Sequence, residues 1–202
     1  MPTHCNTGTH DLHLVLGSSS PFRRSLLERL GVDFSTAVPN VDESPKADES
    51  PRGLVLRLAR EKALAVAREH PRALIIGSDQ VACIEGEVLG KPGDRQTAIR
   101  QLGRASGNWV DFYTGLCLLN SKTNKAQVVC ELFQVQFRSL SGEQIERYLD
   151  REQPFNCAGS FRSEGLGIAL FKRMRGDDPN VLIGLPLIRL VGMLDNEGIS
   201  VI

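Results

Sequence analysis

The chain has 202 residues, of which 41% are hydrophobic, and this is enough for one well-buried core or for one domain with two lobes. Lysine plus arginine equals aspartate plus glutamate, at 24 each, which excludes the global basic field of a dedicated nucleic-acid-binding protein. Five cysteines without a CxxC pair argue against a disulfide framework and favour reduced thiols in a cytoplasmic protein.

We predict a flexible N-terminal tail at residues 1–11 and a single domain over residues 12–202. The tail has neither a basic region nor an apolar one, so we expect no signal peptide. A metal cluster is the alternative interpretation, drawn from four side chains: His4, Cys5, His10 and His13. A loose tail leading into the first strand is the favoured interpretation.

A short apolar run at 14–16 is followed by three serines, a proline and an apolar helical pattern closed by Gly31. This order predicts a strand, a small-residue loop and a helix, with Ser20 as the N-cap and Pro21 at the first helical position. Free backbone N–H groups and the helix dipole at such a loop suit a phosphate group.

Two arginines, Arg23 and Arg24, lie in the first turn of this predicted helix, where cations are normally disfavoured. A bound anion would remove that conflict, and the hydroxyls of Ser18 and Ser20 could donate hydrogen bonds to it. The alternative is an ordinary capped surface helix whose arginines are solvated.

The remaining pattern alternates helices and strands in an α/β manner. Up to position 105, the predicted elements are a strand at 34–38, an acidic loop at 39–50, a helix from 50 to about 69, a strand at 73–78, a hairpin at 81–89 and a helix from 94 to about 105. Beyond it, they are strands at 109–119 and 126–138, a helix from 141 to about 151, a strand at 167–172 and a helix within 181–194 opened by Pro186. The last apolar stretch is too short to span a bilayer. We therefore expect a mixed sheet with helices packed on it and no membrane association.

Single polar residues at element ends are the candidates for chemistry. Asp79 follows a predicted buried strand, a usual place for a catalytic carboxylate in α/β proteins, although it could simply start a turn. Lys91 lies in a Gly-Lys-Pro turn near the same strand ends, although it could simply be a solvated loop lysine. Lys62 shares a helix face with apolar residues, so it can point toward packed structure. The adjacent acids Asp42 and Glu43 carry oxygen ligands that suit magnesium or manganese, although such pairs are usually solvated.

Together these segments resemble one known family. The motifs, in the order in which that family has them, are Ser18-x-Ser20-Pro21-x-Arg23-Arg24, Val41-Asp42-Glu43, Arg60-Glu61-Lys62-Ala63, Gly77-Ser78-Asp79-Gln80-Val81, Gly90-Lys91-Pro92, Phe112-Tyr113-Thr114-Gly115 and Gly159-Ser160-Phe161. From about residue 12 to the C-terminus, the chain resembles the Maf family of nucleoside triphosphate pyrophosphatases. Two later segments, 157–165 and 178–186, are similar to the bacterial YceF-type branch of that family, which acts on 7-methyl-GTP.

This resemblance implies a fold and a reaction. The fold would be an elongated, twisted mixed sheet with flanking helices and two lobes around a cleft, as in inosine triphosphate pyrophosphatases. The reaction would be hydrolysis between the α and β phosphates to a nucleoside monophosphate and pyrophosphate, with a divalent metal cation, Mg²⁺ or Mn²⁺, and it would remove modified nucleotides from the pool. The implied partner is a nucleoside triphosphate, without nucleic acid or membrane, and a homodimer is a candidate assembly.

The resemblance also implies roles for individual residues. Asp79 matches the family's proton acceptor, and Lys62 and Lys91 would neutralise the triphosphate and the leaving pyrophosphate. Glu43, together with Asp42, would hold the metal. Phosphate oxygens would be bound by four residues: Ser18, Ser20, Arg23 and Arg24.

The base would be read by Phe22, Gln80 and Glu164. Guanine methylated at N7 is a cation, so the aromatic ring of Phe22 would attract it by a cation–π interaction. The Glu164 carboxylate could accept two hydrogen bonds, from the guanine N1–H and 2-amino groups. The family's dTTP/UTP-preferring branch typically has arginine and glutamine at these two positions, whereas the 7-methyl-GTP branch usually has tryptophan where this chain has Phe22.

Two alternatives remain open from the sequence. One is a dTTP/UTP pyrophosphatase, which belongs to the same class of enzyme. The other is a non-hydrolysing nucleotide-binding regulator of septum formation, for which the sequence sign would be a missing Asp79 or Lys91. Both residues are present, so the enzyme is favoured.

Overall fold

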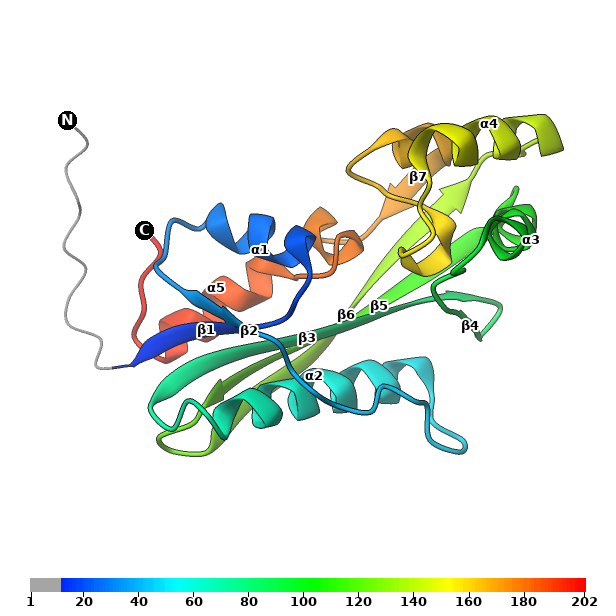
Figure 1. Cartoon of the computed structure of the whole chain (residues 1–202). Coiled ribbons are helices and arrows are strands. Elements are labelled where there is room, and N and C mark those ends of the chain that lie inside the picture. The colour runs from blue at the N-terminus through cyan, green and yellow to red at the C-terminus, as the bar shows by residue number, and fades with distance from the viewer. Residues whose placement is uncertain (1–11) are drawn as a thin grey trace.

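The structure is a computed structural model that describes residues 12–202 (Figure 1). The predicted tail at 1–11 lies outside the described residues, and so do three members of the alternative metal cluster: His4, Cys5 and His10. The fourth member, His13, shares a hydrogen bond of 2.7 Å with the Ser35 hydroxyl.

The elements alternate along the chain largely as expected. The helices are α1 (Pro21–Glu28), α2 (Pro51–Ala67), α3 (Arg95–Ala105), α4 (Gly142–Glu152) and α5 (Leu187–Asn196). The strands are β1 (His13–Gly17), β2 (Ser35–Ala37), β3 (Ala73–Ile84), β4 (Glu87–Leu89), β5 (Trp109–Asn120), β6 (Lys125–Phe137) and β7 (Phe171–Arg175). Short 3₁₀ turns are η1 (Ala158–Ser160), η2 (Leu166–Leu170) and η3 (Pro179–Leu182).

Within the described residues, the seven strands form one mixed sheet in the order β2-β1-β3-β5-β6-β7, with β4 beside β3. The β1 strand pairs with β2 and β3 in parallel, and the other pairings are antiparallel. Figure 1 shows α2 along one face of the long strands and α1 with α5 on the opposite face, while α3 and α4 lie toward the far end. The expected elongated mixed sheet with flanking helices is therefore confirmed.

The hydrophobic core follows the length of the sheet in separate parts. Leucines of α1 and α5 pack with β1 and the first half of β3 in one cluster, and α2 covers the opposite face of these strands with small residues such as Ala59 and Ala63. A further cluster joins α3, α4 and the far ends of β3, β5 and β6 around Phe112, Phe137 and Phe161. The long strands thus connect two lobes, and a site can form where the lobes meet.

The β3 strand has an open stretch in the middle of one edge. Its first residues pair with β1 as far as Gly77, and β4 pairs with it only from Ala82 onward. Among the described residues, no strand covers this edge between those two points, although β5 pairs with β3 continuously on the other side. Asp79 and Gln80 lie in that stretch, so their surroundings are formed by loops and by α2.

Two glycines allow α2 to lie very close to the sheet. A Cβ atom on Gly77 would lie 2.1 Å from the carbonyl oxygen of Ala59, and one on Gly115 would lie 2.1 Å from that of Val55. Any side chain at either position would push the helix away. This close contact brings the side chain of Lys62, on α2, within reach of β3.

The sequence interpretation was wrong at two places. The strand predicted at 73–78 continues to Ile84, because antiparallel pairing with β5 carries it through its polar centre. The segment predicted as a strand at 167–172 is mostly η2, since Gly167 lies against the carbonyl of Arg162 and tightens the chain there, and the strand is Phe171–Arg175. The C-terminal helix opens at Pro186 as predicted: α5 follows this residue, and the apolar residues before it form η3 and a turn at Gly184, whose φ is +111°.

A search of the described part of the chain finds no helix that is both long and apolar enough to cross a membrane.

Candidate active site

A cavity of about 750 Å³ lies where the two lobes meet. It is bounded by the loop between β1 and α1, by α2 and β3, by the turn after β4 and by the segment 153–164. It is lined by all but two of the residues expected to form the site: Ser18, Ser20, Phe22, Arg23, Glu43, Lys62, Asp79, Gln80, Lys91 and Glu164. Elements distant in sequence therefore place these side chains around one space.

The serine loop presents polar groups at the N-terminus of α1. Ser20 is the N-cap, and its hydroxyl accepts a hydrogen bond from the Arg23 backbone N–H. The Ser18 hydroxyl accepts from the Ser20 N–H at 3.1 Å, and Ser18 itself is buried. Because the Ser18 oxygen acts as an acceptor here, its own proton can be donated to an anion in the cavity.

The two neighbouring arginines have different surroundings. Arg23 Nε donates to the Gly184 carbonyl at 2.8 Å and its Nη1 to the Ser18 hydroxyl at 3.5 Å. Burial lowers the pKa of Arg23, while the nearby charges of Asp79 and Glu43 act in the opposite direction. Its guanidinium is therefore a partly desolvated cation at the cavity wall.

Arg24 does not line the cavity, so the structure does not bring it together with the other residues expected to contact phosphate. Its Nε pairs with Glu28 one turn along α1, and its side chain is 62% exposed. Successive residues of a helix point about 100° apart, so α1 can direct only one of the two arginines inward. The structure directs Arg23 inward and Arg24 toward solvent.

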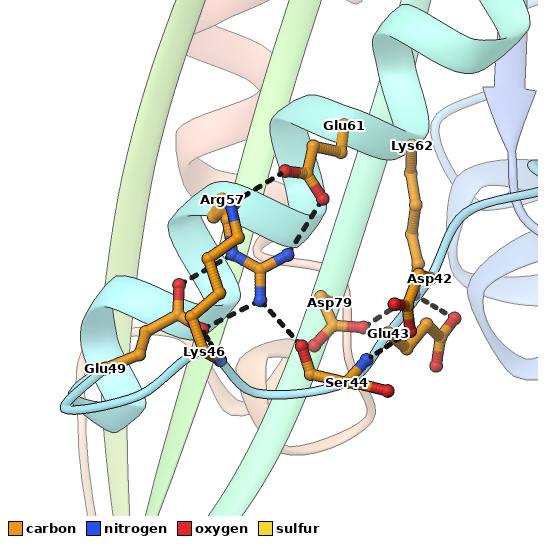
Figure 2. Close-up of polar contacts among 9 residues, drawn as sticks. All are labelled: Asp42, Glu43, Ser44, Lys46, Glu49, Arg57, Glu61, Lys62 and Asp79. Atoms are coloured by element: carbon orange, nitrogen blue, oxygen red, sulfur yellow. Dashed lines mark hydrogen bonds and ion pairs between the residues drawn. The ribbon is translucent and has the colours of Figure 1, made fainter.

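Lys62 links two of the carboxylates that face the cavity, those of Asp79 and Glu43 (Figure 2). Its Nζ lies 2.6 Å from Asp79 Oδ1 and 2.7 Å from Glu43 Oε1. The Lys62 side chain is only 7% exposed, and a lysine this buried needs charged partners to offset its loss of hydration. The result is a chain of three charges that runs from β3 through α2 to the loop before α2.

Glu43 stands on that loop and is more exposed than the other two members. Burial raises its pKa, but the hydrogen bond and charge of Lys62 outweigh this, and Lys91 and Arg23 add to the lowering. The pKa of Glu43 is therefore below its ordinary value, and the carboxylate is ionised. Lys91, which lines the cavity from the turn after β4, thus contributes positive potential at the same point.

The chemistry of these carboxylates fits a divalent cation. The Lys62 ammonium group takes the point on which the oxygens of Glu43 and Asp79 converge, so a metal ion would bind beside that lysine, at Glu43. Carboxylate oxygens suit Mg²⁺ and Mn²⁺. The described residues contain no group of three or more His, Cys, Asp or Glu side chains arranged to hold a metal. A metal here would therefore complete its coordination with water and phosphate oxygens, as Mg²⁺ commonly does.

Asp42 lies beside this group but does not line the cavity. Its Oδ1 accepts a hydrogen bond from the Ser44 N–H at 2.9 Å, and this bond lowers the pKa of Asp42. One of its oxygens is therefore engaged in holding the loop, and the structure does not place Asp42 with Glu43 on the cavity wall.

The cavity lining also contains an aromatic ring and a carboxylate that both lie beside a cation. The guanidinium carbon of Arg162 lies 5.3 Å from the centre of the Phe22 ring, and Arg162 Nε lies 3.9 Å from Glu164 Oε1. That Nε is buried and has no hydrogen-bond partner within the described structure. Gln80 uses its amide nitrogen for Thr114 and for a backbone carbonyl, so only its carbonyl oxygen can read a base.

Sequence reasoning missed Arg162 and Cys157, which also line the cavity. Burial raises the pKa of the Cys157 thiol, whereas the neighbouring Arg162 acts in the opposite direction. The signal for Arg162 was its place between the aromatic Phe161 and the acidic Glu164 in a recognised motif.

Comparison with known proteins agrees with these motifs. The family model described as Maf-like protein matches residues 13–197 of the chain. The chain belongs to the Maf family.

Relatives of this Maf-family chain match it over most of its length. A protein of Alcanivorax borkumensis named 7-methyl-GTP pyrophosphatase is 65% identical over 93% of this chain and 95% of its own length. Proteins of the same name from Nitrosococcus oceani and Colwellia psychrerythraea are 56% and 57% identical, each over 94% of this chain and 95% and 94% of their own lengths.

A solved structure supports the fold. The Ham1 protein of Staphylococcus aureus aligns with a TM-score of 0.51 over 92% of this chain and 99% of its own, with 10% identical residues. That likeness concerns the fold alone, and it is the fold type expected for Maf proteins.

Proposed function

We propose that the protein hydrolyses 7-methyl-GTP to 7-methyl-GMP and pyrophosphate, and that it removes this modified nucleotide from the cytoplasmic pool. The observation that carries the proposal is that two kinds of side chain line one cavity. Its arginine, lysine and serine side chains suit phosphates, and its ring and carboxylate, which both lie beside Arg162, suit a cationic base. The names of the relatives agree with this chemistry.

The triphosphate would bind at the serine loop. Ser18 and Arg23 would contact phosphate oxygens, and Lys62 and Lys91 would neutralise the charge that develops on the leaving pyrophosphate. Donors that are already in position before the reaction stabilise such charge most effectively, because they need no reorganisation. Lys62 meets this requirement through its contacts with two carboxylates.

Asp79 would orient the attacking water and accept its proton. Its carboxylate lies on a rigid strand and is fixed by Lys62 at 2.6 Å, so the geometry needed for a general base is preset. Glu43 would hold the Mg²⁺ or Mn²⁺ ion, whose chemistry is to neutralise phosphate oxygens. In this arrangement, the two acids have separate tasks although they share one lysine.

The base would be selected by its positive charge. Methylation at N7 makes guanine a cation, and Phe22 and Glu164 already accept the guanidinium of Arg162. The Glu164 carboxylate can also pair with the two N–H donors of the guanine edge. A neutral pyrimidine offers neither the charge nor this pair of donors.

The proposal is tested by pyrophosphate release from a panel of 7-methyl-GTP, GTP, dTTP and UTP. We expect the highest kcat/KM for 7-methyl-GTP. The control is Asp79→Asn purified in the same way, which should lose about 10²–10⁴-fold in rate while it remains folded and binds nucleotide. An Asp79→Asn variant with normal turnover would exclude the mechanism, and equal or better turnover of dTTP would exclude the substrate.

A further inference from the structure

We propose that Arg57 is a positioning residue for this reaction, because it fastens the loop that carries Glu43 to α2. The inference rests on the proposed function, in which Glu43 acts at the phosphates. It assigns a task to a cluster of charged side chains that lies outside the cavity lining (Figure 2).

Arg57 contacts two carboxylates from the first half of α2. Its Nε and Nη2 donate to the two carboxylate oxygens of Glu49, each at 2.7 Å, and its Nη1 donates to Glu61 at 2.8 Å. The side chains of Arg57 and Glu49 are 15% and 12% exposed. A two-point contact of this kind between guanidinium and carboxylate fixes orientation as well as distance.

The same guanidinium reaches the residue next to Glu43. Arg57 Nη2 donates to the Ser44 carbonyl at 3.1 Å, while the Ser44 N–H donates to Asp42. Ser44 is therefore held at both of its backbone polar groups. Figure 2 shows this arrangement, with Glu43 directed toward Lys62 and Asp79.

Glu43 depends on such a support more than its partners do. Lys62 and Asp79 lie on a helix and a strand, whose backbone hydrogen bonds fix them. Glu43 lies on a segment without regular structure, and its side chain is 58% exposed. Displacement of a catalytic group by about 1 Å can cost 10²-fold in rate, so a support outside the cavity can control the reaction.

The test uses a conservative substitution with a matched control. Arg57→Lys keeps the charge but removes the two-point contact, and Arg60→Lys makes the same change at an exposed position one turn along α2. We expect Arg57→Lys to lower kcat/KM for 7-methyl-GTP by about 10-fold to 10²-fold. Arg60→Lys should retain the wild-type value.

A double-mutant cycle separates positioning from general support of the fold. If Arg57 acts through Glu43, Arg57→Lys should have little further effect once Glu43→Gln is present, because the two losses share one cause. If the losses in kcat/KM of the two single variants multiply in full in the double variant, the proposal is overturned. An Arg57→Lys variant as active as Arg60→Lys would also overturn it.

A second readout does not depend on activity. Lys46 lies in the exposed part of the loop, so release of the loop from α2 should speed tryptic cleavage of the folded protein after Lys46. Mass spectrometry measures the rate of this cleavage. Arg57→Lys should be cut faster than wild type and Arg60→Lys, and Glu49→Gln, which breaks the contact from the loop side, should behave like Arg57→Lys. Unchanged cleavage in both variants would overturn the proposal. Failure of the wild type to release pyrophosphate would instead refute the proposed function, and the cleavage result would remain interpretable.

Discussion

Lys62 is the residue on which the candidate site depends, because a single ammonium group contacts a carboxylate from β3 and a carboxylate from the loop before α2. Without it, two negative groups would face one another beside the place proposed for the phosphates. The lysine therefore fixes the acids in the free protein and supplies positive charge to a triphosphate. Both effects require that it stay buried, which α2 ensures.

The neighbouring arginines of α1 offer a matched pair for a prediction. Arg23→Ala should lower kcat/KM by about 10-fold to 10²-fold, since a hydrogen bond to a charged group is worth about 1.5–3 kcal/mol. Arg24→Ala should stay within about twofold of wild type, because its pair with Glu28 is exposed. The measurement is kcat/KM for 7-methyl-GTP in both variants, and a larger loss in Arg24→Ala would refute the assignment of Arg23 to phosphate.

The sequence could predict residues with local signals and not those with distant partners. Ser20 and Pro21 define a helix start within a few positions, so the serine loop was predictable. The choice between Arg23 and Arg24 depends on the segment around Gly184, which contacts Arg23 from 161 residues away. Arg57 gave no signal, because its main partner Glu49 lies on the irregular segment just before the N-cap of α2, where helical periodicity does not apply.

At the scale of elements, the distance between α2 and the sheet controls the site. Gly115→Ala would place a methyl group against the Val55 carbonyl and force the helix outward. We expect a loss of about 1–3 kcal/mol in the free energy of unfolding, together with reduced activity because Lys62 moves with the helix.

The control for this substitution is Gly103→Ala on α3, where nothing lies within 4 Å of the added methyl group. That change should raise the free energy of unfolding by roughly 0.5–1 kcal/mol, because alanine favours a helix over glycine. Urea unfolding measures the free energy of unfolding of both variants. A Gly115→Ala variant as stable as wild type would contradict the close contact between α2 and the sheet.

The loop before α2 should show a characteristic pH dependence. The hydrogen bond from Arg57 is the main cause that lowers the pKa of Glu49 from 4.5 to about 2. A lowered carboxyl pKa adds stability that is complete above the ordinary value and is lost as the pH falls through the folded value. The difference in unfolding free energy between wild type and Glu49→Gln should therefore be constant above pH 4.5 and shrink as the pH falls toward about 2.

The comparison for this pH series is Glu143→Gln, which removes an exposed pair with Arg147 on α4. Exposed pairs of this kind contribute little, so the variant should unfold like wild type across the series. A difference for Glu49→Gln that grows as the pH falls would show that the pair with Arg57 does not stabilise the loop.

Element prediction from the sequence succeeded where caps and periodicity were local. The helices after Ser50, Asp94 and Ser141 begin at the predicted caps. The polar run after Gly77 predicted an end to β3, but pairing with β5 continues the strand. The catalytic candidates on β3 therefore lie along an open stretch of the edge of this strand and not at its end. Only the pairing register of the sheet could reveal this position.

At the scale of the whole molecule, the long strands place two kinds of recognition in one cavity. The serine loop and α2 belong to one lobe, and the segment 153–164 belongs to the lobe of α3 and α4. Lys91, which follows β4, comes from the second lobe as well, so both lobes contribute to the cavity. The family resemblance implied two lobes around a cleft, whereas the contact of Arg162 with Phe22 required the folded chain.

The most direct test of this account is the ratio of kcat/KM for 7-methyl-GTP to kcat/KM for dTTP, measured in wild type and in Glu164→Gln. The substitution keeps the size of the side chain but turns one acceptor into a donor that faces a guanine N–H. We predict a ratio well above one in wild type and a fall of about tenfold or more in the variant, since an unmet polar pairing costs about 1–3 kcal/mol. An equal fall for both substrates would contradict the assignment of Glu164 to the base and, with it, the preference for 7-methyl-GTP.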